Sequence, residues 1–351
     1  MKLHGHTSVL IGSAIAIGVL SPSSLTGQVD SRAAELAAAR GGSPGRVIVM
    51  CLRTALTLPS CQLAALDSAV FLASNSVSAY FNENSYGRVT LTGDVAGPFT
   101  ISLGEQCDRV GWADAADAVA TAAGLDVAAY TYRVYIEPPE TAILCVNEGS
   151  SQRALGSPRR SSWVRGDHWD SRLVIAHELG HNVFGSPHAS SPTAVYGDGS
   201  TVMGLAPVLN PLIPGNWQDT PHFNAPEKIQ MGWVPRANVE SVTEDGNYRV
   251  ALLEAGSTEI QVLRIQGSGM GYFFSYRRPV GFDASLLSWY ANRTSIHLWN
   301  LEDEPYLLAT IGDGQSFTDA SGLSVTQTRH DATYAYLMIS FSAAMPTAPS
   351  R

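Results

Sequence analysis

The 351-residue sequence has little charge and almost no lysine. Only 15% of its residues are charged, against about 25% in ordinary soluble domains, and Lys2 and Lys228 are its only lysines. With 22 basic and 31 acidic residues it lacks the basic footprint that nucleic-acid binding requires, so no nucleic-acid partner is expected. A hydrophobic content of 45% excludes intrinsic disorder. The length predicts two domains, or one large domain with an appendage.

The sequence also lacks an apolar run long enough to cross a bilayer as a helix. The run at residues 9–20 has about a dozen residues, against the ~20 that a spanning helix needs. It follows Lys2 and precedes small, turn-forming residues up to Gly27, which is the arrangement of a secretory signal peptide. We therefore expect a signal peptide at residues 1–27, a short linker or propeptide at residues 28–45, and a secreted, extracellular protein without a permanent membrane anchor.

Cysteine is scarce, and its spacing fits no metal site. The four cysteines form no C-x-x-C pair and match no zinc-knuckle spacing, so two disulfides of an exported protein are the expected role. Four cysteines allow three pairings. Proximity in the sequence favours Cys51–Cys61 and Cys107–Cys145.

Hydrophobic patterning predicts an α+β fold. Strands are expected at residues 47–52, 88–92, 98–103 and 130–136, and helices at residues 63–81 and 113–123. The arginines between residues 153 and 172 are interpreted as a solvated loop. After about residue 235 the pattern favours strands alone, at residues 248–253, 260–265, 272–276, 296–299 and 334–341. An α+β front domain followed by an all-β tail domain is therefore expected.

Residues 177–181 read H-E-L-G-H and follow apolar residues at helical spacing. On a helix, His177 and His181 project from the same face and can hold one Zn²⁺. Glu178 lies one step round the helix, where it can take a proton from a metal-bound water without being a ligand. Burying two imidazoles and a carboxylate on an apolar helix is costly unless a metal or hydrogen bonds compensate, which favours a metal site.

The flanking residues indicate where this helix begins and how the chain returns to it. Asp170 or Ser171 can cap its N-terminus. Gly185 can take the left-handed conformation that ends a helix and turns the chain back. His188 can then supply the third ligand from the returning segment. Met203 follows a glycine-punctuated turn and can form an apolar floor under the histidines.

With these residues the chain resembles the metzincin zinc peptidases, whose pattern is H-E-x-x-H-x-x-G-x-x-H followed by a Met-turn. Within them it is similar to the gametolysin-type family, through S-Y-G at 85–87, Y-G-D at 196–198, H-F-N-A-P at 222–226 and Q-M-G-W at 230–233. The resemblance implies a catalytic domain at residues 46–235, with a mixed twisted sheet and an active-site helix, and a smaller all-β domain at residues 236–351. It also implies zinc as cofactor and proteolysis of extracellular proteins or glycoproteins, such as those of a cell wall or matrix.

The spacing departs from the metzincin pattern by one residue. Three residues, 182–184, separate the second histidine from Gly185, where the family has two. One extra helical residue rotates the chain beyond it by about 100°, which misdirects His188 unless a π-bulge absorbs the insertion. Asp198 and then His222 are the alternative third ligands. Together with Tyr196 they are also candidates for the cleft.

The predicted reaction is endopeptidase hydrolysis, with three neutral imidazoles that leave one position for water and Glu178 as general base. The alternative is a non-catalytic secreted binding or adhesion protein that keeps zinc only for structure. The intact glutamate disfavours it, because a structural site has no use for that carboxylate. The remaining histidines beyond the signal peptide are interpreted as ordinary surface or hydrogen-bonded residues: His168, His297 and His330.

The β-rich tail has two interpretations. It is expected to stabilise the catalytic domain by covering its sheet or cleft edge. Alternatively, it recruits a polysaccharide or glycoprotein substrate through exposed aromatic side chains. The candidates for that role are Tyr272, Phe273, Phe274 and Tyr276.

Overall fold

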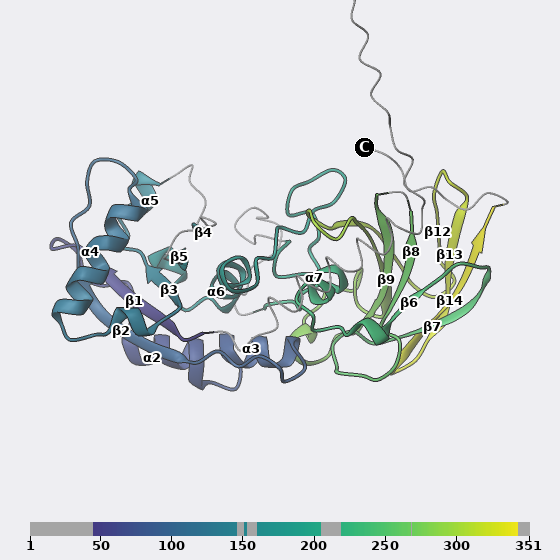
Figure 1. Cartoon of the computed structure of the whole chain (residues 1–351), viewed down its shortest axis with the longest axis horizontal. Coiled ribbons are helices and arrows are strands. Elements are labelled where there is room, and N and C mark those ends of the chain that lie inside the picture. The colour runs from purple at the N-terminus through teal and green to yellow at the C-terminus, as the bar shows by residue number, and fades with distance from the viewer. Residues whose placement is uncertain (1–44, 146–150, 153–159, 205–218, 268, 343–351) are drawn as a thin grey trace, which may run out of the picture.

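In the computed structural model the described residues form three β-sheets, with the longer helices gathered around the first (Figure 1). These residues are 45–145, 151–152, 160–204, 219–267 and 269–342. The expected signal peptide and nearly all of the expected linker lie outside them. Within these ranges no helix combines the length and the apolar character that crossing a bilayer requires.

The first sheet has the strand order β2-β1-β3-β5-β4, in which only the short edge strand β4 runs antiparallel to its neighbour. Alternate residues of β1 face two different cores, one set starting at Val47 and the other at Ile48. A parallel sheet covered on both faces buries both sets, which explains the continuous apolar run. The strands are β1 (Val47–Arg53), β2 (Gly93–Thr100), β3 (Tyr132–Ile136), β4 (Ser151–Gln152) and β5 (Arg160–Val164).

Helices cover both faces of this sheet. On one face lies α4 (Arg109–Ala122), and on the other lie α2 (Leu63–Asp67), η1 (Ser68–Leu72), α3 (Val77–Asn84) and α6 (Arg172–Leu179). The single helix expected at residues 63–81 is therefore wrong. The π-helical η1 ends at Leu72, and α3 begins anew after Ser76, whose hydroxyl accepts the Ala79 N–H at 3.1 Å. A local serine cap thus competes with continuation of the helix.

One further expectation for this half is wrong, and another is wrong in part. Residues 88–92 form no strand. The Val89 N–H instead bonds the Ser85 hydroxyl at 2.8 Å, which ties the segment to the end of α3. Of the arginine-rich stretch at 153–172, expected to be a solvated loop, residues 153–159 lie outside the described residues and Arg165 is exposed, but residues 160–164 form β5, in which Trp163 is buried. Arg172 is buried too, and its guanidinium donates to the Asn75 carbonyl at 2.7 Å.

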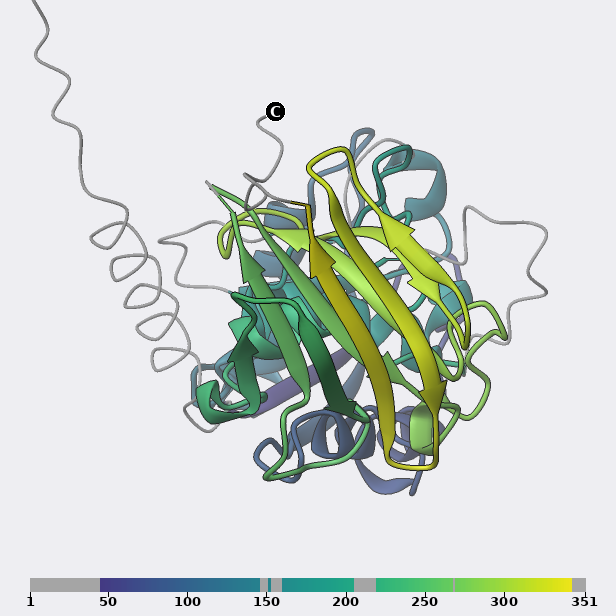
Figure 2. The same ribbon diagram turned by 90° about the vertical axis from the view of Figure 1, so that its right-hand side faces the viewer.

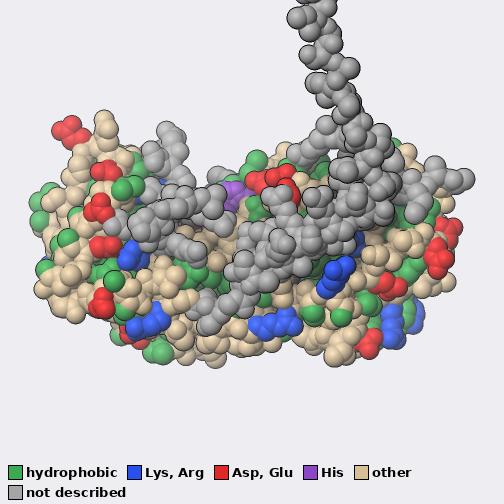
Figure 3. Space-filling model, in the orientation of Figure 1, with side chains coloured by type: hydrophobic (Ala, Val, Ile, Leu, Met, Phe, Trp, Pro, Cys, Tyr) green, Lys and Arg blue, Asp and Glu red, His purple; other side chains and the backbone are tan. Residues whose placement is uncertain are grey.

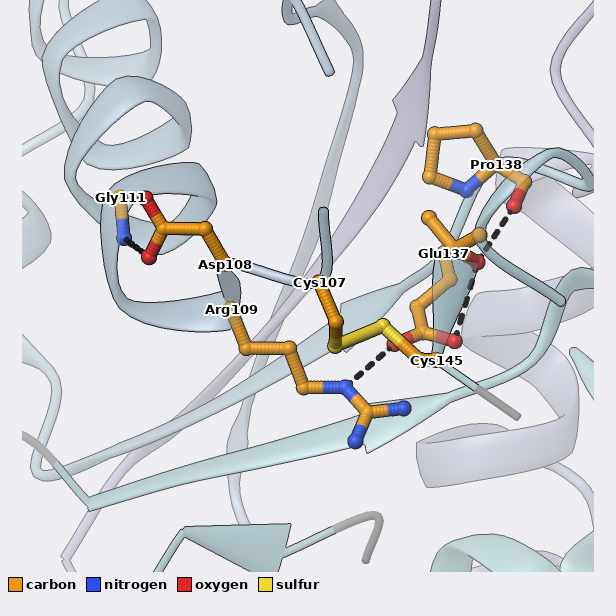
Figure 4. Close-up of a disulfide and its surroundings, with 8 residues drawn as sticks. Cys107, Asp108, Arg109, Gly111, Glu137, Pro138 and Cys145 are labelled. Carbon is orange, nitrogen blue, oxygen red and sulfur yellow. Dashed lines mark hydrogen bonds and ion pairs between the residues drawn. A yellow bond between two sulfur atoms is a disulfide. The ribbon is translucent and has the colours of Figure 1, made fainter. Parts of the chain in front are cut away.

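Both disulfides join the pairs favoured by proximity, Cys51–Cys61 and Cys107–Cys145. The second links the residues just before α4 to the end of α5 (Thr141–Leu144). Beside it, Arg109 Nε donates to Glu137 Oε1 at 2.7 Å, with both side chains buried (Figure 4). The start of α4 is therefore joined to the end of α5 by a covalent bond and, through Glu137, to the end of β3 by an ion pair.

Beyond residue 235 the chain forms two sheets, with orders β11-β10-β9-β8-β6 and β12-β13-β14-β7. Figure 2 views them with the four-stranded sheet in front. Five strands were expected here, and β6, β11, β12 and β13 were not. The strands are β6 (Val239–Ser241), β7 (Gly246–Ala251), β8 (Val262–Gln266), β9 (Gly271–Arg277), β10 (Arg293–Trp299), β11 (Tyr306–Ile311), β12 (Ser316–Thr318), β13 (Leu323–His330) and β14 (Tyr334–Phe341).

The hypothesis of an exposed aromatic platform in this part is wrong. Tyr272, Phe274 and Tyr276 pack between the two sheets, where each is at most 2% exposed. Phe273 points to the other side of β9 and is 1% exposed. It packs there in a cluster that also contains Ala225, at the start of α7 (Ala225–Gln230). These aromatic side chains build cores and are not available to bind substrate.

Lys228 of α7 is fully buried where the two halves of the chain meet. Its Nζ lies 3.2 Å from His222 Nδ1 and 3.3 Å from the Leu253 carbonyl oxygen, and it sits over the Tyr86 ring. Burial lowers the pKa of Lys228 to about 7. The charged groups around it are Glu83, Glu254, Arg277 and Asp283.

Replacing Lys228 with methionine is expected to change how stability depends on pH. An unfolded lysine titrates near pH 10.4. Between about pH 7 and that value the unfolded chain therefore binds more protons at Lys228 than the folded one, and stability rises with pH. The variant loses this contribution. The free energy of unfolding of the variant minus that of the wild type should increase by on the order of 1 kcal/mol for each pH unit as the pH falls from 10 to 7. Below pH 7 this difference should stay constant.

Urea unfolding of the two proteins at several pH values measures this difference. The variant Arg249→Met is a control, since Arg249 is exposed and contacts only surface groups among the described residues, the Glu259 carboxylate and the Tyr334 ring. Parallel stability curves for wild type and Lys228→Met would contradict the expectation.

Candidate metal centre

The helix α6 begins at a serine cap. The Ser171 hydroxyl accepts the Val174 N–H at 3.2 Å, so Ser171, and not Asp170, caps the helix. The apolar residues that come next, Leu173 and Ile175 among them, are buried in the core beneath the first sheet. The helix is thus fixed along its length, and His177 near its end and His181 just beyond it project from one face.

A π-helical turn absorbs the extra residue. The segment η4 (Gly180–Phe184) continues α6 directly, and Gly185 ends it at φ 65° and ψ 28°, the left-handed conformation expected of it. The Gly185 N–H bonds the His181 carbonyl at 3.0 Å, and the Ser186 N–H bonds the Gly180 carbonyl at 3.1 Å. The π-bulge interpretation is confirmed, and the chain leaves the helix in a direction that returns His188 to the other two histidines.

The three imidazoles converge on one point. His181 Nε2 lies 3.1 Å from His177 Nε2 and 3.0 Å from His188 Nε2. All three side chains are partly exposed, and Figure 3 shows histidine at the surface midway along the molecule. Among the described residues they form a group whose ligand atoms all lie within 4.8 Å of one another.

Hydrogen bonds behind the rings fix their tautomers. His177 Nδ1 lies 2.8 Å from the Val202 carbonyl oxygen, and His181 Nδ1 lies 2.7 Å from that of Ser186. A carbonyl can only accept, so both Nδ1 atoms carry a proton and both Nε2 atoms present lone pairs. Burial lowers the pKa of His177. Burial and the neighbouring His177 lower the pKa of His188 to about 4.

This donor set fits zinc. The Nε2 lone pairs of His177 and His181 face each other at 3.1 Å with no proton between them, and a cation there removes the repulsion. Three nitrogen ligands with one position left open are the pattern of a catalytic zinc site. The bonds from Nδ1 to carbonyl oxygens also match the way in which metal-ligating histidines are oriented.

Glu178 and Tyr196 lie beside the histidines. Glu178 is 7% exposed, and its backbone carbonyl accepts the Ser162 hydroxyl at 3.3 Å. The ring centroid of Tyr196 lies 4.0 Å from that of His188 and 6.1 Å from that of His177. Burial, and then the negative charge of Glu178, raise the pKa of Tyr196. The structure thus places Tyr196 at the histidine group.

Met203 packs directly under the metal-binding helix. It is fully buried, and a Cβ added to Gly180 would lie 2.6 Å from its Sδ atom. A side chain at position 180 would therefore force the methionine to shift. The Met203 carbonyl also accepts the Ala189 N–H at 3.0 Å. This bond joins residues 196–204, here called the methionine loop, to the residue after His188.

Asp198 and His222 do not belong to the histidine group. Both side chains are fully buried, which argues against the expectation that they face a cleft. The Asp198 carboxylate is bonded by Ser200, Asn224 and His297. His222 lies between Glu83 Oε1, at 2.9 Å, and Lys228 Nζ, at 3.2 Å. Neither is therefore placed as a third ligand.

Sequence reasoning missed the groups that support the histidines. The carbonyl oxygens of Val202 and Ser186 are backbone atoms, which leave no trace in residue type. His297 was expected to be a surface or hydrogen-bonded histidine, and it is hydrogen-bonded; what was not expected is the partner, Asp198, 99 residues away. No signal in the sequence connects the two positions.

A helix that carries two imidazoles, a third imidazole on the returning chain, a neighbouring glutamate and a buried methionine below define a mononuclear metallopeptidase centre. The sequence model of the gametolysin peptidase M11 family matches residues 62–313. The chain therefore belongs to this family of zinc metallopeptidases. It is also similar to an autolysin of Chlamydomonas reinhardtii, with 27% identity over 205 residues. The match covers 48% of this chain and only 30% of that protein.

Proposed function

We propose that this protein is a secreted zinc-dependent endopeptidase that hydrolyses extracellular protein or glycoprotein substrates. The observation that carries the proposal is the convergence of three imidazole Nε2 atoms, with two rings locked by bonds from Nδ1 to backbone carbonyls. The metal ligands are His177, His181 and His188. The family membership supports peptide hydrolysis as the reaction, and the similarity to an autolysin supports a substrate outside the cell.

The residues divide the chemistry between them. When bound, zinc supplies a Lewis acid that polarises the scissile carbonyl and makes the attacking water more acidic. Glu178 takes the proton from that water and later gives it to the leaving amine. Its position next to His177 on α6 supports this role as general base and not as a ligand. Met203 forms the apolar floor of the site, and Tyr196 lines the cleft beside His188.

The domain organisation and the secretion are part of the proposal. Residues 46–235 form the metzincin-like catalytic domain, and residues 236–351 form the smaller β-rich domain. Separate hydrophobic clusters in the two parts support this division. All four cysteines are paired, which supports folding in an oxidising compartment after export.

The alternative is a non-catalytic, zinc-containing binding or adhesion protein, and a digestion separates the two. Purified zinc-loaded protein is expected to cleave casein, to lose this activity with a zinc chelator and to regain it when zinc is restored, since the ligands hold the metal reversibly. The variant Glu178→Gln, purified in the same way, controls for contaminating peptidases. Absence of chelator-sensitive cleavage by the zinc-loaded protein would favour the binding protein.

A further inference from the structure

The orientation of His177 depends on a loop that lies beyond the metal-binding helix in the sequence. Its Nδ1 bonds the carbonyl of Val202, so a shift of residues 196–204 would turn the imidazole away from the other two. The loop carries Met203 as well, and the N–H of Ala189, next to His188, bonds its carbonyl. Whatever holds this loop therefore holds two of the three proposed ligands.

Asp198 organises the loop from within. Its Oδ1 accepts the N–H of Ser200 at 3.0 Å and the hydroxyl of Ser200 at 2.6 Å. Its own N–H bonds the Ala189 carbonyl at 3.3 Å, and a Cβ on Gly204 would lie only 1.6 Å from its carbonyl oxygen. Asp198 thus anchors this loop through its carboxylate at Ser200 and through its backbone at Ala189 and Gly204.

The outer oxygen of this carboxylate is held by the C-terminal strands. Asp198 Oδ2 accepts from His297 Nε2, in β10, at 2.9 Å, and from Asn224 Nδ2, the cap of α7, at 3.1 Å. All three side chains are fully buried. Burial alone would raise the pKa of Asp198, but the hydrogen bonds from His297 and Ser200 keep it below its usual value. Without His297 a buried carboxylate would lose a partner that water cannot replace.

A second contact from the same sheet holds the chain just after the third histidine. The Ser190 N–H bonds the Pro305 carbonyl at 3.0 Å, and the Leu307 N–H bonds the Ser190 carbonyl at 2.9 Å. Ser190 thereby pairs in parallel with Tyr306 at the start of β11. The Ser190 hydroxyl adds a bond to Glu304 Oε2 at 2.9 Å. The sheet that contains β10 and β11 thus contacts both the loop of residues 196–204 and the chain just after His188.

We propose that His297 is a positioning residue for the metal site, through which the C-terminal sheet sets the geometry of His177. The inference rests on the proposed function only in taking His177, His181 and His188 as zinc ligands. It gives the β-rich tail a definite role: the tail completes the support of the ligands, and the catalytic half does not build that support alone.

The test compares three variants of the full-length protein. The variant His297→Met keeps most of the volume and removes the donor. His297→Gln keeps an N–H donor at the same distance from the backbone. Leu337→Ala opens a cavity in the four-stranded sheet, where Leu337 of β14 is 1% exposed. The measurements are zinc affinity by chelator competition, the visible spectrum of the cobalt-substituted protein, the urea midpoint, and kcat and KM on a peptide.

We expect His297→Met to weaken zinc binding about tenfold, the lower end of the range for groups that orient metal ligands. It should also alter the cobalt spectrum and lower kcat with little change in KM. His297→Gln should restore most of the affinity, and Leu337→Ala should lower the urea midpoint but bind zinc like the wild type.

Wild-type zinc affinity and cobalt spectrum in folded His297→Met would overturn the proposal. So would an equal loss of affinity in Leu337→Ala, because the effect would then be one of general stability. If His297→Met does not fold, His297→Gln is compared with Leu337→Ala instead. A loss of zinc affinity in His297→Gln that stands in the same ratio to its loss of urea midpoint as in Leu337→Ala also overturns the proposal. Zinc affinity is measured without a substrate, so a protein that binds zinc but cleaves nothing would refute the proposed function and leave this test intact.

Discussion

Replacing Glu178 with glutamine is expected to lower kcat on a peptide substrate by about 10²–10⁴-fold, the usual contribution of a general acid–base group. Glutamine has the same shape but cannot accept the proton of the attacking water. Because Glu178 is not one of the three converging nitrogen ligands, zinc affinity should stay within about twofold of wild type. Steady-state kinetics and a chelator titration on the same preparation measure both quantities.

The matched control is Glu244→Gln, at an exposed position of the C-terminal half. It makes the same chemical change away from the site and should leave kcat and zinc affinity as they are. Undiminished hydrolysis by Glu178→Gln would remove Glu178 from the mechanism. A loss of zinc from that variant would instead make Glu178 part of the metal site itself.

Replacing His188 with alanine is expected to have the second large effect, on metal binding. Loss of a group that only orients a ligand costs about 10–100-fold in affinity, and the loss of a ligand should cost more. The π turn brings His188 Nε2 to 3.0 Å from His181 Nε2, so its removal leaves a site with two nitrogen ligands. Zinc content after dialysis and affinity by chelator competition measure the change, and hydrolysis should fall with zinc occupancy.

His330→Ala is the control for this variant. His330 is a partly exposed histidine of β13 whose Nδ1 lies 2.8 Å from Asp313, and its loss should leave zinc binding unchanged. Wild-type affinity in His188→Ala would show that another group completes the site. Asp198→Asn and His222→Gln, each measured in the His188→Ala background, would then identify it.

The parts of the fold that the sequence predicts correctly are those whose signal is local. The strand β1 is expected from its β-branched run, and α6 from apolar residues at helical spacing. The strand β5 was missed because it reads R-S-S-W-V and is polar where a core strand is usually apolar. The reason lies in tertiary structure: the Ser162 hydroxyl donates to the Glu178 carbonyl and accepts from Asn182 at 2.5 Å, so the strand bonds the active-site helix.

The same distinction applies to the site. Spacing along one helix places His177, Glu178 and His181 together, and the left-handed Gly185 makes the return of His188 understandable. The partners of Asp198 depend on a histidine 99 residues further on, in a strand whose position is set only by packing against the rest of the chain. Sequence patterns report local geometry, and a buried polar network joins segments that no periodicity relates.

The π turn at residues 180–184 has a consequence for recognising related enzymes from sequence. A search for the fixed spacing H-E-x-x-H-x-x-G-x-x-H passes over this chain, although the distance from Gly185 to His188 is unchanged. The site requires a helix that ends in a residue of left-handed conformation. The third histidine must then follow three positions after that residue. The stretch between the second histidine and that glycine can lengthen by one residue if the helix widens, so length variation there need not signal loss of the metal.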